Sequence, residues 1–239
     1  RSSQKKQLRW QFLMNTEKSL KENIMTTIID NDRWSLWKRN VVDKYKSMTD
    51  DMIKADLKKS INPIAVCMEH WNGDFNISTL IRNANAFNIE KVYYLGKRKI
   101  DRRGCVGTHH YTDIEYLHDG IHSLLDLKDK YTFIAIDNNV AKTHKLREFD
   151  WNMLEKPPLV FFGEEGCGLT EEILNLSDYR IEIEQYGSVR SLNVGTASGI
   201  VLFECVQRLR NSKVSHKLQT ELYDEICNEQ NVPSQLILL

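Results

Sequence analysis

Three segments of this chain combine small residues with side chains that are able to do chemistry. They are FNISTLIRNANAF at residues 75–87, VFFGEEGCG at 160–168 and RSLNVGTASG at 190–199. The second and third place a turn of small residues at the end of an apolar strand, which is where an open α/β sheet holds its ligand. Glycines in such turns let the backbone approach a flat ligand closely. We therefore expect the three segments to form one ligand site.

The polar residues in these segments suggest what that site binds. Arg82 is a cation on a mostly apolar helix, and such a residue needs an anionic partner. Glu165 stands beside an apolar strand, and Ser191 and Asn193 can supply hydrogen bonds in front of a helix of small residues. Each segment also has a purely structural interpretation: an internal salt bridge for Arg82, a surface strand–helix turn for the second segment, and a closely packed helix for the third.

Other familiar chemistries lack their sequence patterns. Neither G-x-G-x-x-G after the first strand nor G-x-x-x-x-G-K-[ST] occurs, so a Rossmann fingerprint and a P-loop are not supported. Ser191 lacks the G-x-S-x-G context of a nucleophile elbow. The clustered histidines at 109, 110, 118 and 122 come without H-E-x-x-H or ligand-spaced cysteines, so we expect no metal site.

Short apolar runs alternating with helical stretches must position these residues. The predicted strands are 63–68, 91–96, 131–136, 158–162 and 180–184. The predicted helices are 76–87, 119–129, 170–177 and 196–211, with Thr170 as an N-cap. This alternation predicts an α/β domain with a parallel sheet that helices cover on both faces.

Helical segments flank that domain. Apolar residues at spacings of three and four from Trp34 to Met52 predict an amphipathic helix that ends near Ser60. A last amphipathic helix is expected at about 214–228, before an apolar tail. The expected organisation is a basic helical extension at 1–60, the α/β domain at 61–211, and a C-terminal helix and tail at 212–239.

Charge is unevenly distributed along the chain. The 239 residues carry 33 Lys/Arg and 33 Asp/Glu, yet residues 1–60 hold 14 of the basic and 8 of the acidic residues. A second basic cluster, KRKIDRR, lies at 97–103. The asymmetry fits a polyanion that contacts a limited surface, with phosphate contacts from Lys97, Arg98, Arg102 and Arg103. A solvated helix face and a charged loop would explain it equally well.

Cysteine usage and hydropathy suggest a location. The five cysteines form no C-x-x-C pair, which favours a reducing compartment. No apolar stretch approaches the roughly 18 residues of a membrane span. We therefore expect a cytoplasmic protein without a membrane partner.

Taken together, the three segments resemble the SpoU/TrmH family of SPOUT RNA methyltransferases. The first family motif, an Asn followed six residues later by an Arg and then by small and aromatic residues, is matched from Asn76 and Arg82 to Phe87. The second, F-G-x-E-x-x-G, is matched at 162–168, and the third, S-L-N-V followed by small residues, at 191–199. The resemblance covers about residues 62–211. It departs from the family at Asn88, where a Gly is usual, and at Glu184, where a Pro is common.

The resemblance implies a fold, a reaction and an assembly. The fold is a parallel-sheet SPOUT domain with a C-terminal deep trefoil knot, and family members are homodimers with the site at the subunit interface. The reaction transfers a methyl group from S-adenosylmethionine to a ribose 2′-hydroxyl of tRNA or rRNA. The short helical extension, without a separate RNA-binding β domain, favours tRNA. A non-catalytic RNA-binding dimer on the same fold and an enzyme that methylates a base nitrogen are the alternatives.

The family motifs also imply roles for individual residues. The catalytic group by resemblance comprises Arg82, Asn76, Glu165, Ser191 and Asn193. The cofactor-binding group comprises Asp137, Phe162, Gly163, Gly168, Ile183, Ser191 and Leu192, with Asn138 as an alternative to Asp137.

Overall fold

The computed structural model describes residues 39–71 and 75–230, with the side chains of 213–230 left aside. The chain divides into two compact units, residues 1–53 and 54–239. The first is described only from residue 39 onward. The second contains the sheet and all three motif segments.

The helix expected from Trp34 to Ser60 is not continuous, and residues 34–38 of it lie outside the described part. A short 3₁₀ helix, η1 (Asp43–Tyr45), precedes α2 (Asp50–Lys58). The Thr49 hydroxyl accepts a hydrogen bond from the backbone N–H of Met52, which favours a helix start at this point. Arg39 donates to the Met48 carbonyl at 2.7 Å, whereas nine residues of straight helix would separate the two by about 13 Å.

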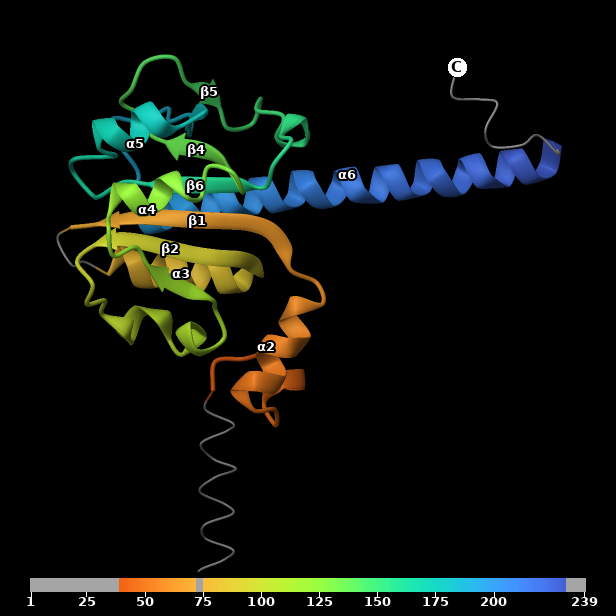
Figure 1. Ribbon diagram of the computed structural model, residues 1–239, viewed down its shortest axis with the longest axis horizontal. Coiled ribbons are helices and arrows are strands. Elements are labelled where there is room, and N and C mark those ends of the chain that lie inside the picture. Colours follow the sequence, from red (N-terminus) through yellow and green to blue (C-terminus); the bar gives the residue numbers. More distant parts are fainter. Residues whose placement is uncertain (1–38, 72–74, 231–239) are drawn as a thin grey trace, which may run out of the picture. The chain divides into compact units, whose positions relative to one another are not determined.

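Seven parallel strands form one sheet in the order β3-β2-β1-β6-β4-β7-β5 (Figure 1). The bounds are β1 (Asn62–His70), β2 (Ile89–Gly96), β3 (Ile114–Tyr116), β4 (Thr132–Ile136), β5 (His144–Lys145), β6 (Pro158–Phe162) and β7 (Tyr179–Glu182). The predicted α/β class and parallel sheet are confirmed. Sequence analysis missed β3 and β5, because strands this short contain no apolar run.

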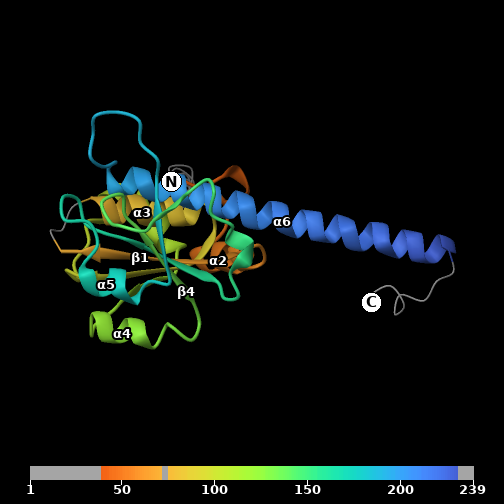
Figure 2. The same cartoon turned by 90° about the horizontal axis from the view of Figure 1, so that it is seen from above.

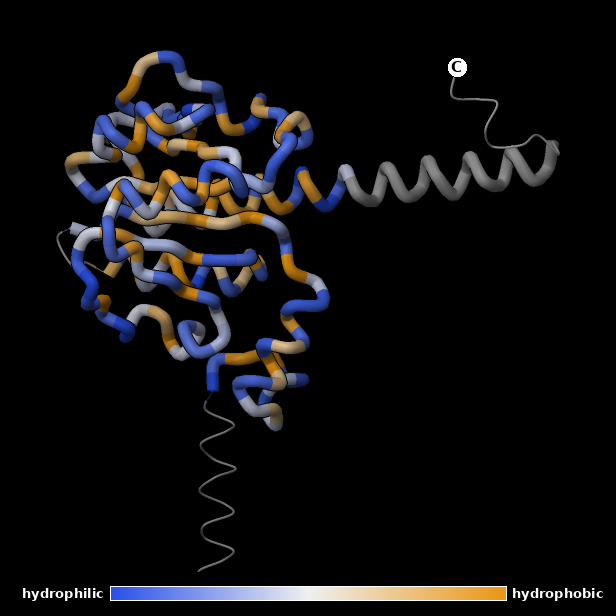
Figure 3. Tube along the Cα trace, in the orientation of Figure 1, coloured by the Kyte–Doolittle hydropathy of each residue, from blue (hydrophilic) through white to orange (hydrophobic). Residues whose placement is uncertain are grey.

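Helices cover both faces of the sheet (Figure 2). On one face lie α3 (Asn76–Ala86) and α6 (Val194–Gln230), and on the other α4 (Ile121–Leu125) and α5 (Glu171–Leu176). Residues 64, 66 and 68 of β1 pack with α3 and α6, while 65 and 67 belong to the opposite core, as strand alternation requires. Figure 3, coloured by hydropathy, shows hydrophobic residues along the central strands β1 and β6.

One long helix replaces the two that we expected near the C-terminus. The predicted helices 196–211 and 214–228 are both part of α6. The sequence NSKV between them contains neither Gly nor Pro, so nothing in it interrupts the hydrogen-bond ladder. No helix in the described ranges has the length and hydrophobicity needed to span a bilayer.

Because every strand runs in the same direction, the carboxyl ends of the strands share one edge of the sheet. The loops that follow β4, β6 and β7 start from this edge, and α3 begins beyond the carboxyl end of β1. Three 3₁₀ helices complete the connections: η2 (Arg102–Cys105), η3 (Thr108–His110) and η4 (Trp151–Met153). Ligands of open α/β sheets bind at this edge, at points where the strand order reverses.

Candidate active site

Three residues from the three motif segments form one hydrogen-bonded network. Asn76, at the start of α3, donates from Nδ2 to Glu165 Oε2 at 3.0 Å. Asn193, just before α6, donates from Nδ2 to Asn76 Oδ1 at 2.8 Å and to Glu165 Oε2 at 3.4 Å. Residues separated by up to 117 positions in the sequence therefore meet at the carboxyl edge of the sheet.

The same network fixes the start of α6. The Asn193 side chain accepts a hydrogen bond from the Thr196 N–H at 3.1 Å, as an N-cap does. Its carbonyl accepts the first helical bond from Ala197. Asn193 thus uses both ends of its amide, one for the helix and the other for the network.

Arg82 and Ser191 lie outside this network. Both side chains are exposed, and neither forms a hydrogen bond or an ion pair with any residue that the structure describes. The internal salt bridge considered for Arg82 is therefore not found in this part of the chain. Arg82 presents an uncompensated cation on the exposed side of α3, and its orientation by Asn76 and Glu165 stays a prediction.

The loop after β6 closes tightly on itself. Glu164 and Gly168 exchange backbone hydrogen bonds at 3.1 and 3.0 Å. A Cβ added to Gly163 would lie 2.2 Å from the Gly168 carbonyl carbon, and Gly168 itself has a φ of +75°. Asp137, in the loop after β4, accepts a hydrogen bond from the Leu169 N–H at 3.3 Å and so links the two loops. The two glycines are required here by space and by backbone conformation.

The loop after β7 offers free backbone groups. Asn138 pairs with both backbone groups of Ile183, accepting from its N–H at 3.0 Å and donating to its carbonyl. Beyond that point, residues 184–192 make no backbone–backbone hydrogen bond with the described residues. Gln185 Oε1 is buried without a partner in the same range. A hollow of about 390 Å³ lies here, lined in part by Asn138, Ile183 and Gln185.

The remaining residues expected to bind the cofactor are mostly apolar. Phe162 and Ile183 are buried in the core at the ends of β6 and β7, and Leu192 packs against that core while staying partly exposed. Of these three residues, Ile183 lines the hollow, together with polar residues such as Asn138 and Gln185, and the volume of the hollow is within the range of small-molecule sites.

Asn83 is a residue near the site whose contacts the sequence analysis missed. It donates from Nδ2 to the Gly195 carbonyl and to Ser198 Oγ, both at 2.9 Å, and so joins α3 to the first turn of α6. A Cβ on Gly195 would lie 2.8 Å from Thr79 Cγ2, which shows how closely the two helices approach. The available signal was the seven-residue interval from Asn76, which puts both amides on one side of α3.

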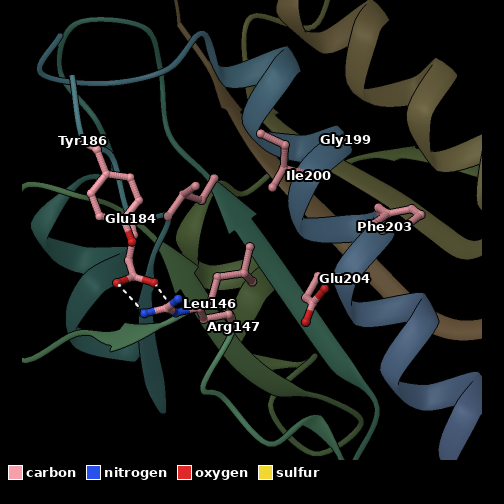
Figure 4. Close-up of a pocket in the computed structure, with 9 residues that line it drawn as sticks. Leu146, Arg147, Glu184, Tyr186, Gly199, Ile200, Phe203 and Glu204 are labelled. Atoms are coloured by element: carbon pink, nitrogen blue, oxygen red, sulfur yellow. Dashed lines mark hydrogen bonds and ion pairs between the residues drawn. The ribbon is translucent and has the colours of Figure 1, made fainter. Parts of the chain in front are cut away.

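Both departures from the family motifs have a structural explanation. Asn88 has a φ of +47°, a left-handed conformation that Asn tolerates better than most residues do, and its side chain donates to the Leu57 carbonyl at 2.9 Å. Glu184 forms an ion pair with Arg147 at 2.6 Å (Figure 4). It forms a second ion pair with Lys145 at 3.3 Å. Neither departure disturbs the hydrogen-bonded network of Asn76, Glu165 and Asn193.

The basic residues at 97–103 differ in how they are held. All four of those predicted to contact RNA are exposed. The Arg103 guanidinium donates to both oxygens of Asp101, the shortest contact being 2.6 Å, and these hydrogen bonds lower the pKa of the Asp101 carboxyl. Arg98 and Arg102 have no such partner among the described residues. Within the same limits, no group of three or more His, Cys, Asp or Glu residues is placed to hold a metal ion.

Comparisons with known proteins show which family the chain resembles. The model of the SpoU rRNA Methylase family matches residues 63–203. A tRNA (guanosine(18)-2′-O)-methyltransferase of Aquifex aeolicus is 30% identical over 161 residues, which cover 66% of this chain and 74% of that one. The Escherichia coli enzyme of the same name is 26% identical over 152 residues, covering 62% of this chain and 65% of its own length.

Solved structures share the fold. The crystal structure of the Aquifex aeolicus TrmH/SpoU tRNA modifying enzyme superimposes with a TM-score of 0.58 at 25% identity, covering 68% of this chain and 86% of that chain. An AdoMet-bound rRNA methyltransferase from Sinorhizobium meliloti gives a TM-score of 0.53 at 25% identity, covering 61% and 56%.

Proposed function

The chain belongs to the SpoU rRNA methylase family and is an S-adenosylmethionine-dependent RNA ribose 2′-O-methyltransferase; we propose that its substrate is tRNA and that Arg82 is its central catalytic residue. The observation that carries the proposal is the convergence of Asn76, Glu165 and Asn193 at the start of α3, the helix that also carries an exposed, uncompensated arginine. The preference for tRNA rests on the named relatives, which are tRNA methyltransferases.

The residues present fit S-adenosylmethionine. When bound, the cofactor supplies a methyl group on a cationic sulfur. The free backbone groups of 184–192 and the buried, unpartnered Gln185 Oε1 offer hydrogen bonds for a purine and a ribose. The turn between Gly163 and Gly168 needs both glycines for its own closure, which gives this loop a fixed backbone shape for the ligand to meet. We assign cofactor binding to these two loops, with Phe162, Ile183 and Leu192 as the apolar walls.

Arg82 acts by charge and not by accepting a proton. A guanidinium stays protonated in proteins, so it is a poor general base. Its exposed cation instead binds the phosphate next to the reacting ribose and stabilises the negative charge that develops on the 2′-oxygen. Asn76, Glu165 and Asn193 hold the two loops and α3 in register, and Ser191 binds the ribose from the loop in front of α6. These groups supply positioning, which an in-line methyl transfer depends on.

RNA binding relies on the basic surface at 97–103 and on the N-terminal segment. Lys97, Arg98 and Arg102 are exposed and can approach phosphates without regard to sequence. Asp101 compensates the charge of Arg103 through an ion pair, so we expect Arg103 to contribute less to phosphate binding.

We further propose that two copies of the chain form a dimer through an apolar surface at the start of α6. Ile200 and Phe203 are 39% and 53% exposed, and Tyr186 is 85% exposed. They line a hollow of about 510 Å³ next to the Glu184–Arg147 ion pair (Figure 4). Large exposed apolar groups grouped in this way are typical of an interface. We also propose that the loops at 163–168 and 183–193 form a trefoil knot. The proposed site of action is the cytoplasm.

Methyl transfer from labelled S-adenosylmethionine to purified tRNA and to rRNA, followed by nucleoside analysis, tests this function. We expect a 2′-O-methylated nucleoside from tRNA that nearly disappears with Arg82→Ala, while cofactor affinity stays within a few-fold. Asn85→Ala on the same helix is the matched control. A methylated base would favour the base-nitrogen alternative, and cofactor binding without transfer to any RNA would contradict the assignment.

A further inference from the structure

An exposed aromatic ring stands immediately before the catalytic network. Phe75 is 52% exposed and belongs to neither hydrophobic core. The next residue, Asn76, bonds to Glu165 and Asn193, so the backbone that carries the ring is fixed by the site itself. About half of the phenylalanine stays exposed to solvent, so much of the apolar surface of its ring is available to a ligand.

Arg103 covers one face of that ring. Its guanidinium carbon lies 5.1 Å from the Phe75 ring centroid, within cation–π range. Asp101 holds the guanidinium through hydrogen bonds to both carboxylate oxygens, and its own carboxylate also accepts the backbone N–H of Arg103. The planar Arg103 guanidinium is therefore held against one face of the Phe75 ring.

The segment that carries Arg103 is firmly attached to α3. Ser78, on α3, donates its hydroxyl proton to the Asp101 carbonyl. A Cβ on Gly104 would lie 2.7 Å from Ser78 Cβ, so η2 and α3 are in direct contact at this glycine. The ring and the guanidinium therefore keep a fixed relation to the start of α3.

The ring shares an exposed row of α3 with the catalytic arginine. Phe75, Thr79 and Arg82 are all exposed and follow one another at intervals of four and three residues, which puts them on one side of a helix. Seven residues of helix correspond to about 10 Å. An aromatic plane and a phosphate-binding cation at this separation fit the base and backbone of a short stretch of single-stranded nucleic acid.

We propose that Phe75, backed by Arg103, is a stacking platform for an unpaired nucleobase of the RNA substrate, and this inference rests on the proposed function. RNA-binding proteins hold splayed-out bases on aromatic rings and on arginine planes. The basic residues nearby favour a polyanion over an apolar protein partner. The enzyme would then require its target nucleotide, or the neighbour of that nucleotide, to lie in a loop and not in a duplex.

Replacing the ring tests the platform. Phe75→Leu keeps an apolar side chain but removes the aromatic plane, and Phe75→Trp keeps the plane. Stacking contributes about 1–3 kcal/mol per base, or roughly 5- to 150-fold in affinity. We expect Phe75→Leu to raise KM for RNA about 10-fold or more with kcat and cofactor affinity little changed, and Phe75→Trp to restore KM. Leu125→Ala, a half-exposed apolar residue on α4, is the matched control.

A direct binding assay separates this inference from the proposed function. Ten-nucleotide oligo(rA) stacks more strongly than oligo(rU), so the wild-type protein should bind oligo(rA) more tightly. Phe75→Leu should remove this preference and leave the salt dependence of binding unchanged. Equal KM values for wild type and Phe75→Leu, or an altered oligomeric state in Phe75→Leu, would overturn the platform. Absence of methyl transfer by the wild type would instead contradict the proposed function.

Discussion

Removing the Asn76 side chain should disconnect the three segments that form the site. The residue is 7% exposed and uses both ends of its amide, donating to Glu165 at 3.0 Å and accepting from Asn193 at 2.8 Å. Asn76→Ala deletes both bonds at once and leaves an α-helical position that alanine fills well.

The magnitude follows from the two bonds. A hydrogen bond to a charged carboxylate contributes about 1.5–3 kcal/mol, and a neutral amide–amide bond about 0.5–1.5 kcal/mol. Their sum is about 2–4.5 kcal/mol. If that energy serves to position the loops, kcat/KM falls by about 30- to 2,000-fold, at 1.36 kcal/mol for each factor of ten.

Steady-state methyl transfer to tRNA measures this loss, with Asn85→Ala as the control on the same helix. Asn76→Asp should be at least as impaired, because it replaces the donor with a second carboxylate facing Glu165. Thermal unfolding reports how much of the loss is general destabilisation. A fall in kcat/KM of less than 3-fold in Asn76→Ala, or one equal to that of Asn85→Ala, would refute the positioning role of the network.

Two further outcomes are expected. Arg102→Gln should reduce the slope of log Kd for RNA against log salt by about 0.7–0.9. Arg103→Gln should change this slope less, because Asp101 already compensates the Arg103 charge. Equal changes in the two variants would contradict this role of the ion pair. Gly163→Ala should lower Tm and weaken S-adenosylmethionine binding, as measured by calorimetry. The new methyl group meets the Gly168 backbone, and overpacking costs about 1–3 kcal/mol of stability. Unaltered cofactor affinity would exclude the 163–168 turn from the cofactor site.

The spacing of glycines and polar residues allowed the three motif segments and the parallel sheet to be predicted without a structure. Apolar runs such as PLVFF at 158–162 are long enough to identify buried strands. The two-residue β5 and the three-residue β3 are too short to do so. Helix boundaries were less predictable. The apolar spacing around residues 34–52 is typical of a helix, but the ion pair between Arg39 and Asp50 cannot form across one continuous straight helix.

The residue types available at the ends of the strands can be identified from the sequence, where three motifs contain Asn76, Arg82, Glu165 and Asn193. Which of these residues meet depends on how the strands and helices pack. The Asn76–Glu165–Asn193 network does not include Arg82 or Ser191, and the packing of the elements brings Asn83 to the Gly195 carbonyl and Arg103 to the Phe75 ring. The physical reason is that periodicity reports burial along one element, whereas a hydrogen bond between residues 117 positions apart depends on how the elements pack.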